Sequence, residues 1–162
     1  LAAESRCKDM GKDGRLRTNV LRLFNVYGSR QGLNGYGGVI SSFLGNAKNG
    51  KPLVIYGDGS QTRDFVHVRD VANSIFETVQ RDVDCEVLNI AYGRPVTINE
   101  LAKQVLQVSG MDTEIQYESP RSGDLKHSFA DISKAEKWLD FKPEISLESG
   151  LRGLLNERSS DD

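Results

Sequence analysis

Two arginines stand in polar surroundings in which a negatively charged ligand could bind. Arg63 follows a glycine-rich turn at 57–59, and Arg121 lies in the polar segment 119–124. The planar guanidinium group donates hydrogen bonds in fixed directions, so it matches a phosphate better than the ammonium group of lysine does. Taken alone, these residues predict either a phosphate site or two surface salt bridges.

Another polar group follows an apolar stretch near the N-terminus. Residues 20–26 are almost continuously apolar, which is typical of a strand covered on both faces in a parallel sheet, and Asn25, Tyr27 and Gly28 stand at its end. Ligands of open α/β sheets bind at the carboxyl ends of the strands. We therefore expect Asn25 either to contact a ligand or to cap a turn.

The sequence offers no nucleophile or metal motif. His67 and His127 have no serine or cysteine at a recognisable spacing, and there is no H-x-x-x-H or H-E-x-x-H. Cys7 and Cys85 are far apart and form no metal-binding pattern. We predict no catalytic residue and no metal site, and a structural role for His67.

Hydrophobic periodicity and turn residues define the elements that must position these side chains. Helices are predicted at about 1–12, 38–48, 71–80, 98–108, 134–139 and 147–155, and strands at about 18–26, 53–56, 62–68, 87–91 and 114–117. The turn at 57–59 predicts a hairpin between two of the strands. Asp70, Ser133 and Ser146 are predicted helix caps, and Thr97 with Glu100 forms a predicted capping box.

These elements predict an α/β fold with only a small share of a large parallel sheet. At most two strands, 20–26 and 87–91, suit such a sheet, and the rest suits a small mixed lobe. The composition is globular, with 162 residues, 38% hydrophobic residues and a net charge of −2. This balance argues against a nucleic-acid or membrane-surface binder. Because there is no signal peptide and no apolar run of about 20 residues, we predict a cytoplasmic protein.

Three segments resemble the extended short-chain dehydrogenase/reductases, the NAD-dependent nucleotide-sugar epimerases and dehydratases. They are LRLFNVYGSRQ at 21–31, IYGDGSQTRDFVHVRDVA at 55–72, and RSGD at 121–124 followed by ADISKA at 130–135. The three occur in the order that the family has. Together they extend over nearly the whole chain.

The resemblance implies that the chain is a C-terminal portion of a longer Rossmann-type enzyme. Residues 1–4 resemble the stretch that follows the lysine of the family's Y-x-x-x-K motif, and we expect the cofactor-binding G-x-x-G-x-x-G to be missing. In this view residues 1–35 end the nucleotide-binding sheet, residues 36–162 are mainly the substrate-binding lobe, and about 70–108 return to the sheet. NAD is then bound mainly by the missing N-terminal part.

The resemblance is strongest to UDP-glucose 4-epimerases, and it implies interconversion of UDP-glucose and UDP-galactose through a 4-keto intermediate. In that family a tyrosine, whose pKa a lysine lowers, takes a hydroxyl proton while hydride moves to NAD. Neither of those residues is expected in this chain, so we predict that the chain alone is inactive. The family also implies a UDP-sugar ligand and a homodimer in the full-length protein.

Roles for individual residues follow only from matching the family's motifs. Arg63 and Arg121 match diphosphate contacts, Asn25 a phosphate or sugar contact, Phe24 a residue facing nicotinamide, Asp124 a ribose contact, and Val39, Leu53 and Tyr56 positions around uracil. Three alternatives stay open. The chain could belong to a 4,6-dehydratase of dTDP-glucose, it could be a sugar-nucleotide binding module without catalysis, or it could be an α/β domain with only ancestral resemblance.

Overall fold

The computed structural model describes residues 2–14, 16–31 and 38–158. Its helices are α1 (Ala2–Lys12), α2 (Gly38–Lys48), α3 (Val68–Gln80), α4 (Ile98–Ser109), α5 (Ser133–Leu139) and α6 (Leu147–Arg158). Its strands are β1 (Val20–Leu23), β2 (Val26–Tyr27), β3 (Leu53–Tyr56), β4 (Thr62–Arg63), β5 (Val66–His67), β6 (Val87–Ile90), β7 (Val96–Thr97), β8 (Ile115–Glu118) and β9 (His127–Ser128). In this part of the chain, no helix is long and apolar enough to cross a membrane.

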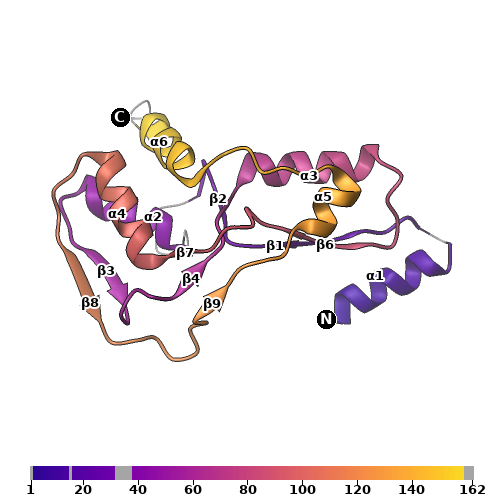
Figure 1. The fold of residues 1–162 in the computed structure, drawn as a ribbon, viewed down its shortest axis with the longest axis horizontal. Helices are drawn as coiled ribbons and strands as arrows, with labels where there is room; N and C mark the ends of the chain where they lie inside the picture. The colour runs from indigo at the N-terminus through magenta and orange to yellow at the C-terminus, as the bar shows by residue number, and fades with distance from the viewer. Residues whose placement is uncertain (1, 15, 32–37, 159–162) are drawn as a thin grey trace.

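The strands pair in small sheets rather than in one large sheet. β1 pairs in parallel with β6, β2 with β5, and β3 with β8, while β4 lies between β7 and β9. One end of the molecule holds β1, β6, α3 and α5, and the other holds α2, α4, β3 and β8 (Figure 1). The predicted α/β class is confirmed, as is the parallel pairing of strands near residues 20 and 87.

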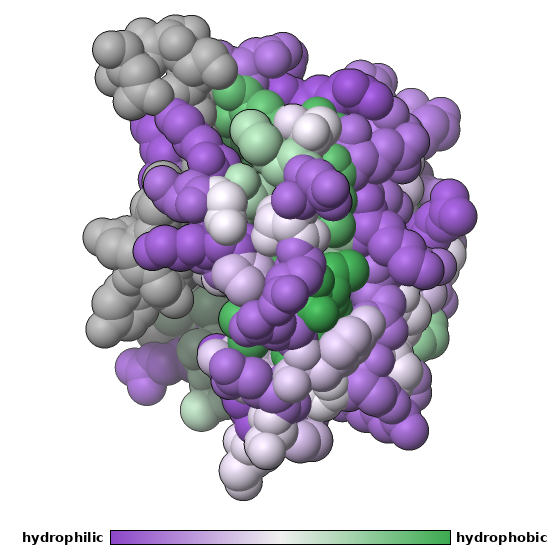
Figure 2. All heavy atoms as spheres, turned by 90° about the vertical axis from the view of Figure 1, so that its left-hand side faces the viewer, coloured by the Kyte–Doolittle hydropathy of each residue, from purple (hydrophilic) through white to green (hydrophobic). Residues whose placement is uncertain are grey.

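Each of these two ends has its own hydrophobic cluster. The larger cluster joins α2, β3, α4 and α6 around the fully buried side chains of Phe43, Leu44 and Leu101. The smaller cluster joins β6, α3 and α5 around Leu88 and Leu139. The outer surface over α2, α4, β3 and β8 is mostly polar, with a strip of apolar side chains between polar flanks (Figure 2).

The predicted single strand at 18–26 is wrong, because the chain changes its pairing partner at Asn25. Phe24 still donates its amide to the Ile90 carbonyl (3.0 Å), whereas the Asn25 carbonyl accepts from the Val66 amide (3.3 Å). The first strand is also not covered on both faces. Leu23 at its end is 49% exposed.

The predicted hairpin at 57–59 is also wrong. Leu53 pairs with Ile115 and Thr62 with Thr97 and His127, so β3 and β4 belong to different sheets. The turn itself exists, and Gly59 has a φ of +74° with the Asn99 side chain lying where a Cβ would stand. The predicted strand 62–68 is likewise divided into β4 and β5.

Helix starts follow the prediction in two cases and depart from it in two. The Thr97–Glu100 capping box is present, and the Ser146 hydroxyl accepts from the Ser149 amide (3.2 Å). Helix α3, however, begins earlier than predicted and is capped by His67, a structural role as expected, whereas α5 has Ile132 at its N-cap rather than Ser133.

Asp70, the predicted cap of α3, is instead a buried residue within the first turn. Its carboxylate accepts from the backbone amides of Glu144 and Ile145 (both 3.2 Å), so it ties α3 to the segment before α6. The apolar face of this helix is only partly buried. Val71 faces the core, but Ile75 and Val79 are exposed.

Candidate functional site

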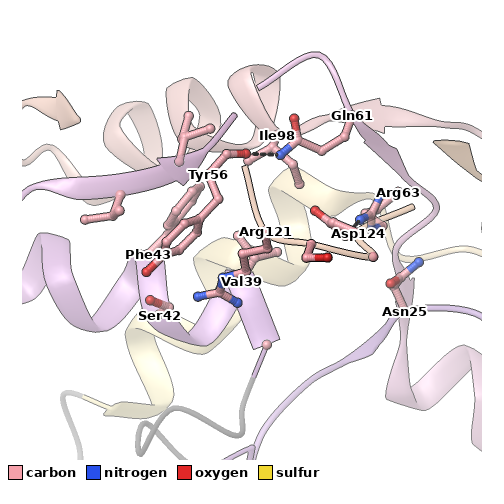
Figure 3. A pocket seen from close by; sticks show the side chains of 15 residues that line it. Asn25, Val39, Ser42, Phe43, Tyr56, Gln61, Arg63, Ile98, Arg121 and Asp124 are labelled. Carbon is pink, nitrogen blue, oxygen red and sulfur yellow. Dashed lines mark hydrogen bonds and ion pairs between the residues drawn. The ribbon is translucent and has the colours of Figure 1, made fainter. Parts of the chain in front are cut away.

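A cavity of about 570 Å³ lies between α2, β3, β4, the start of α4 and the segment before β9 (Figure 3). The segments that form it come from distant parts of the sequence. The residues that line it are Asn25, Gly38, Val39, Ser42, Phe43, Val54, Ile55, Tyr56, Gln61, Arg63, Ile98, Arg121, Ser122, Gly123 and Asp124. Two guanidinium groups and one carboxylate among them give the lining an excess of positive charge.

The apolar wall of the cavity comes from α2 and β3. Val39 and Phe43 are four residues apart on α2 and therefore share one helix face. Side chains alternate along a strand, so Tyr56 points to the opposite side from Leu53. Leu53 is fully buried in the core and does not line the cavity, unlike Val39 and Tyr56.

Arg121 lies against the aromatic ring of Tyr56. Its guanidinium carbon is 3.8 Å from the ring centre, the distance of a cation–π contact. Within the described part of the chain, no hydrogen-bond or ion-pair partner holds its guanidinium nitrogens. The five N–H groups of Arg121 are thus available to an anion in the cavity.

Arg63 is held much more firmly than Arg121. Its guanidinium donates to the Thr62 carbonyl (2.8 Å) and the Leu125 carbonyl (2.7 Å), and it forms an ion pair with Asp124. The Arg63 side chain is 14% exposed and the Asp124 side chain 38%. The salt bridge that the sequence left as one alternative is present, and Arg63 also lines the cavity, whereas its phosphate contact stays a prediction.

Asn25 lines the cavity at the point where the chain passes from β1 to β2. Its side-chain amide donates to the Asp64 carbonyl (3.3 Å), which fixes its direction. Phe24, its neighbour, is half-buried and is not among the lining residues. The nicotinamide contact of Phe24 remains a prediction.

Asp64 is a fully buried carboxylate beside this site, with backbone amides as its partners. It accepts from Tyr92 (2.8 Å), Gly93 (3.1 Å) and Ala130 (3.3 Å). Burial raises the pKa of Asp64, and the three amide bonds offset part of that effect. Its carboxylate thereby joins β4 to the loop after β6 and to the segment after β9.

The sequence interpretation did not single out Ser42 and Gln61. Gln61 donates to the Tyr56 carbonyl (2.7 Å) and so joins the end of β3 to the start of β4 across the turn. Ser42 lies on α2 next to Phe43, and only its exposed position at helical spacing from Val39 could have indicated it. Across the described residues, no group of three or more His, Cys, Asp and Glu side chains could hold a metal ion.

The glycines before α2 correct one expectation. Positions 32, 35 and 38 have the spacing G-x-x-G-x-x-G, and Gly38 is the first residue of α2, so this spacing is not missing from the sequence. It follows the LRLFNVYGSRQ segment, whereas the family resemblance implies a cofactor motif upstream of that segment. Residues 32–37 lie outside the described residues, and Gly38 lines the cavity.

The model of the NAD dependent epimerase/dehydratase family matches residues 1–91. The chain belongs to this family. A putative UDP-glucose 4-epimerase of Methanocaldococcus jannaschii is 39% identical over 137 residues, which are 85% of this chain and 44% of that protein.

Solved structures of the epimerase/dehydratase family agree in fold. The UDP-glucose 4-epimerase of Thermotoga maritima with UDP-glucose has a TM-score of 0.94 and 35% identity, covering 99% of this chain and 52% of that one. A UDP-N-acetylglucosamine 4-epimerase of Methanobrevibacter ruminantium in complex with UDP-N-acetylmuramic acid has a TM-score of 0.93 and 36% identity, with the same coverage. The chain therefore spans about half the length of these relatives.

Proposed function

We propose that this chain supplies the nucleotide-sugar pocket of an NAD-dependent 4-epimerase acting on a UDP-sugar, with UDP-glucose as the first candidate. The observation that carries the proposal is Arg121, whose N–H groups face a cavity without a partner in the described residues. Membership of the family supports the reaction class. The similar solved structures with UDP-sugars support the ligand class.

The cavity has a suitable surface for each part of such a ligand. Val39, and the Tyr56 ring where Arg121 does not cover it, offer apolar surface to a planar base, and Asp124 offers acceptors to vicinal ribose hydroxyls. Arg121, together with the N–H groups of Arg63 that make no contact within the protein, would bind the diphosphate. Asn25 would contact a phosphate or the sugar.

We infer that the chemical step requires residues outside this chain. The sequence has no Y-x-x-x-K, and among its residues only Phe24 is proposed to face NAD. Bound NAD would take hydride from the sugar C4 and return it. The residues of this chain bind and orient the nucleotide portion, so that the chain alone is expected to bind ligand without turnover.

The architecture supports part of the division of the chain that the resemblance implies. Helix α4, which ends the range 70–108, packs with α2, β3 and α6 and not with β1 and β6. Val20 pairs with Val87 in the parallel ladder of β1 and β6, so residues 20–23 and 87–90 lie in one layer. We propose that this layer continues the nucleotide-binding sheet and that most of 36–162 forms the substrate-binding lobe. A homodimer in the full-length protein and a cytoplasmic location remain predictions of the family resemblance.

Isothermal titration of the chain with UDP, dTDP and NAD tests the proposal. We expect UDP to bind, NAD not to bind, and Arg121→Ala to weaken UDP binding at least about tenfold through loss of a charge-assisted contact. Arg94→Ala, which removes an exposed arginine away from the cavity, is the matched control and should leave the affinity unchanged. Equal UDP affinity in the wild type and Arg121→Ala would refute the proposed site, and a preference for dTDP would favour the dehydratase.

A further inference from the structure

The segment 121–126 carries two of the proposed ligand contacts but has little packing of its own. All six residues are exposed, including Leu125. Its backbone bonds are a turn from the Asp124 amide to the Arg121 carbonyl (3.3 Å) and a bond from the Thr62 amide to the Lys126 carbonyl (2.9 Å). A segment with so few buried contacts opens at small free-energy cost unless other groups hold it.

Arg63 supplies most of what holds this segment. One terminal nitrogen of its guanidinium donates to the Leu125 carbonyl (2.7 Å) and to the Thr62 carbonyl (2.8 Å), while the other pairs with Asp124. A single rigid, mostly buried group thus binds both its own strand and two residues of the segment. A lysine has the charge but not the planar fork that these three contacts require.

These contacts use three of the five N–H groups of the guanidinium, so two remain for a ligand. We propose that Arg63 is chiefly a positioning residue, which fixes the segment 121–126 so that Arg121 and Asp124 face the cavity. This inference rests on the proposed function for the identity of the ligand. The contacts of Arg63 with the segment do not depend on that function. It differs from a role as a phosphate contact alone.

The first test needs no ligand. In Arg63→Lys we expect backbone amide exchange, followed by NMR, to become about tenfold faster at Thr62 and Asp124, while amides inside α4 keep the wild-type rate. Arg69→Lys, on an exposed residue of α3, is the matched control and should change neither. Unchanged exchange at Thr62 and Asp124 in a folded Arg63→Lys protein would overturn the proposal.

A second variant guards against general destabilisation. Asp124→Asn removes the ion pair and leaves the two carbonyl contacts of Arg63, so the exchange rate at Thr62 and at position 124 should rise less than in Arg63→Lys. An equal or larger rise in Asp124→Asn would show that Arg63 adds nothing beyond the ion pair, and would overturn the proposal.

The second test separates positioning from phosphate binding by using uridine, which has no phosphate. We expect Arg63→Lys to weaken both uridine and UDP about tenfold, because the segment that carries the ribose contact is released. A loss of affinity for UDP alone would overturn the positioning role and would indicate that Arg63 only contacts the phosphate. If the wild type binds neither nucleotide, the proposed function fails, while the exchange experiment still decides the role of Arg63.

Discussion

Arg121 and Tyr56 form a flat, charged surface on one side of the cavity. The guanidinium lies over one face of the ring, so a base would stack on the guanidinium plane or on the other face of the ring, and the N–H groups at the guanidinium edge can hold the attached phosphate. Loss of the ring would act on both portions of the ligand, because the ring also holds Arg121. Uridine, which has no phosphate, therefore reports on the base portion alone.

We expect Tyr56→Leu to weaken uridine binding about tenfold, since base–aromatic stacking stabilises by about 1–3 kcal/mol. Tyr56→Phe keeps the ring, loses only the hydroxyl and should bind uridine like the wild type. Titration calorimetry with uridine measures both. Wild-type affinity in Tyr56→Leu would place the base elsewhere in the cavity.

Asp64 provides a prediction on stability. In Asp64→Asn one oxygen becomes an NH₂ group that faces a backbone N–H donor, because the carboxylate accepts from three amides. We expect a loss of about 1–3 kcal/mol in the free energy of unfolding, measured with urea. Asp112→Asn, on an exposed carboxylate, is the control and should stay within about 0.5 kcal/mol of the wild type.

The raised pKa of Asp64 also predicts a pH dependence. The folded protein holds this proton at pH values where the unfolded chain has already lost it, so this carboxyl lowers the stability as the pH rises from its ordinary pKa to its raised one. Below that window its contribution is unchanged. Urea unfolding at a series of acidic pH values should show this slope in the wild type and not in Asp64→Asn, and equal slopes would contradict it.

At the scale of the elements, the sequence predicted those features that depend on contacts between residues close in the chain. The helix at 38–48, the strand at 53–56 and the capping box at Thr97 are set by neighbouring residues, and the structure has all three as predicted. The hairpin at 57–59 failed because β3 pairs with β8 rather than with the strand that follows it. A turn motif gives no information about a partner so far along the chain.

In the candidate site, too, some features could be predicted from the sequence and others could not. Family motifs indicated Arg63, Arg121 and Asp124, which the structure brings into one cavity. The uracil contact of Leu53 stays a prediction, and its side chain lies in the core and is not part of the cavity lining. The two contacts of Arg63 with the segment 121–126 could not be predicted, because they depend on how β4 and β9 pair.

The capping box of α4 gives a prediction for one element. The Thr97 hydroxyl accepts from the Glu100 amide (3.1 Å), and the Glu100 carboxylate accepts from the Thr97 amide (2.8 Å). Thr97→Ala should lower the free energy of unfolding by about 1 kcal/mol. Thr97→Ser keeps the hydroxyl and should lose less than half of that in the same urea titration, and an equal loss would show that the hydroxyl is not the cause.

At the scale of the whole molecule, α3 carries an apolar surface that the described residues do not cover. Ile75, Phe76 and Val79 are 49%, 60% and 77% exposed. Contiguous exposed apolar side chains of this size promote association in water. The surface lies at the end of the molecule opposite to the cavity-bearing helices α2 and α4 (Figure 1).

We expect the chain to associate in a concentration-dependent way in sedimentation velocity experiments. Replacing Phe76 and Val79 by serine should reduce the association and change the free energy of unfolding by less than about 1 kcal/mol, because both side chains are exposed. Gln80→Ser on the same helix is the polar control and should leave the association as in the wild type. Persisting association in the double variant would assign it to another surface.

The distance in sequence between paired strands has a consequence for how the molecule reaches its fold. Val20 pairs with Val87, Leu53 with Ile115 and Thr62 with His127. Each ladder closes a long loop before it gains its first bond, so folding should be slow, on the order of milliseconds to seconds. During synthesis β1 leaves the ribosome well before β6 is made. The apolar residues of β1 therefore stay unpaired until β6 has been synthesised.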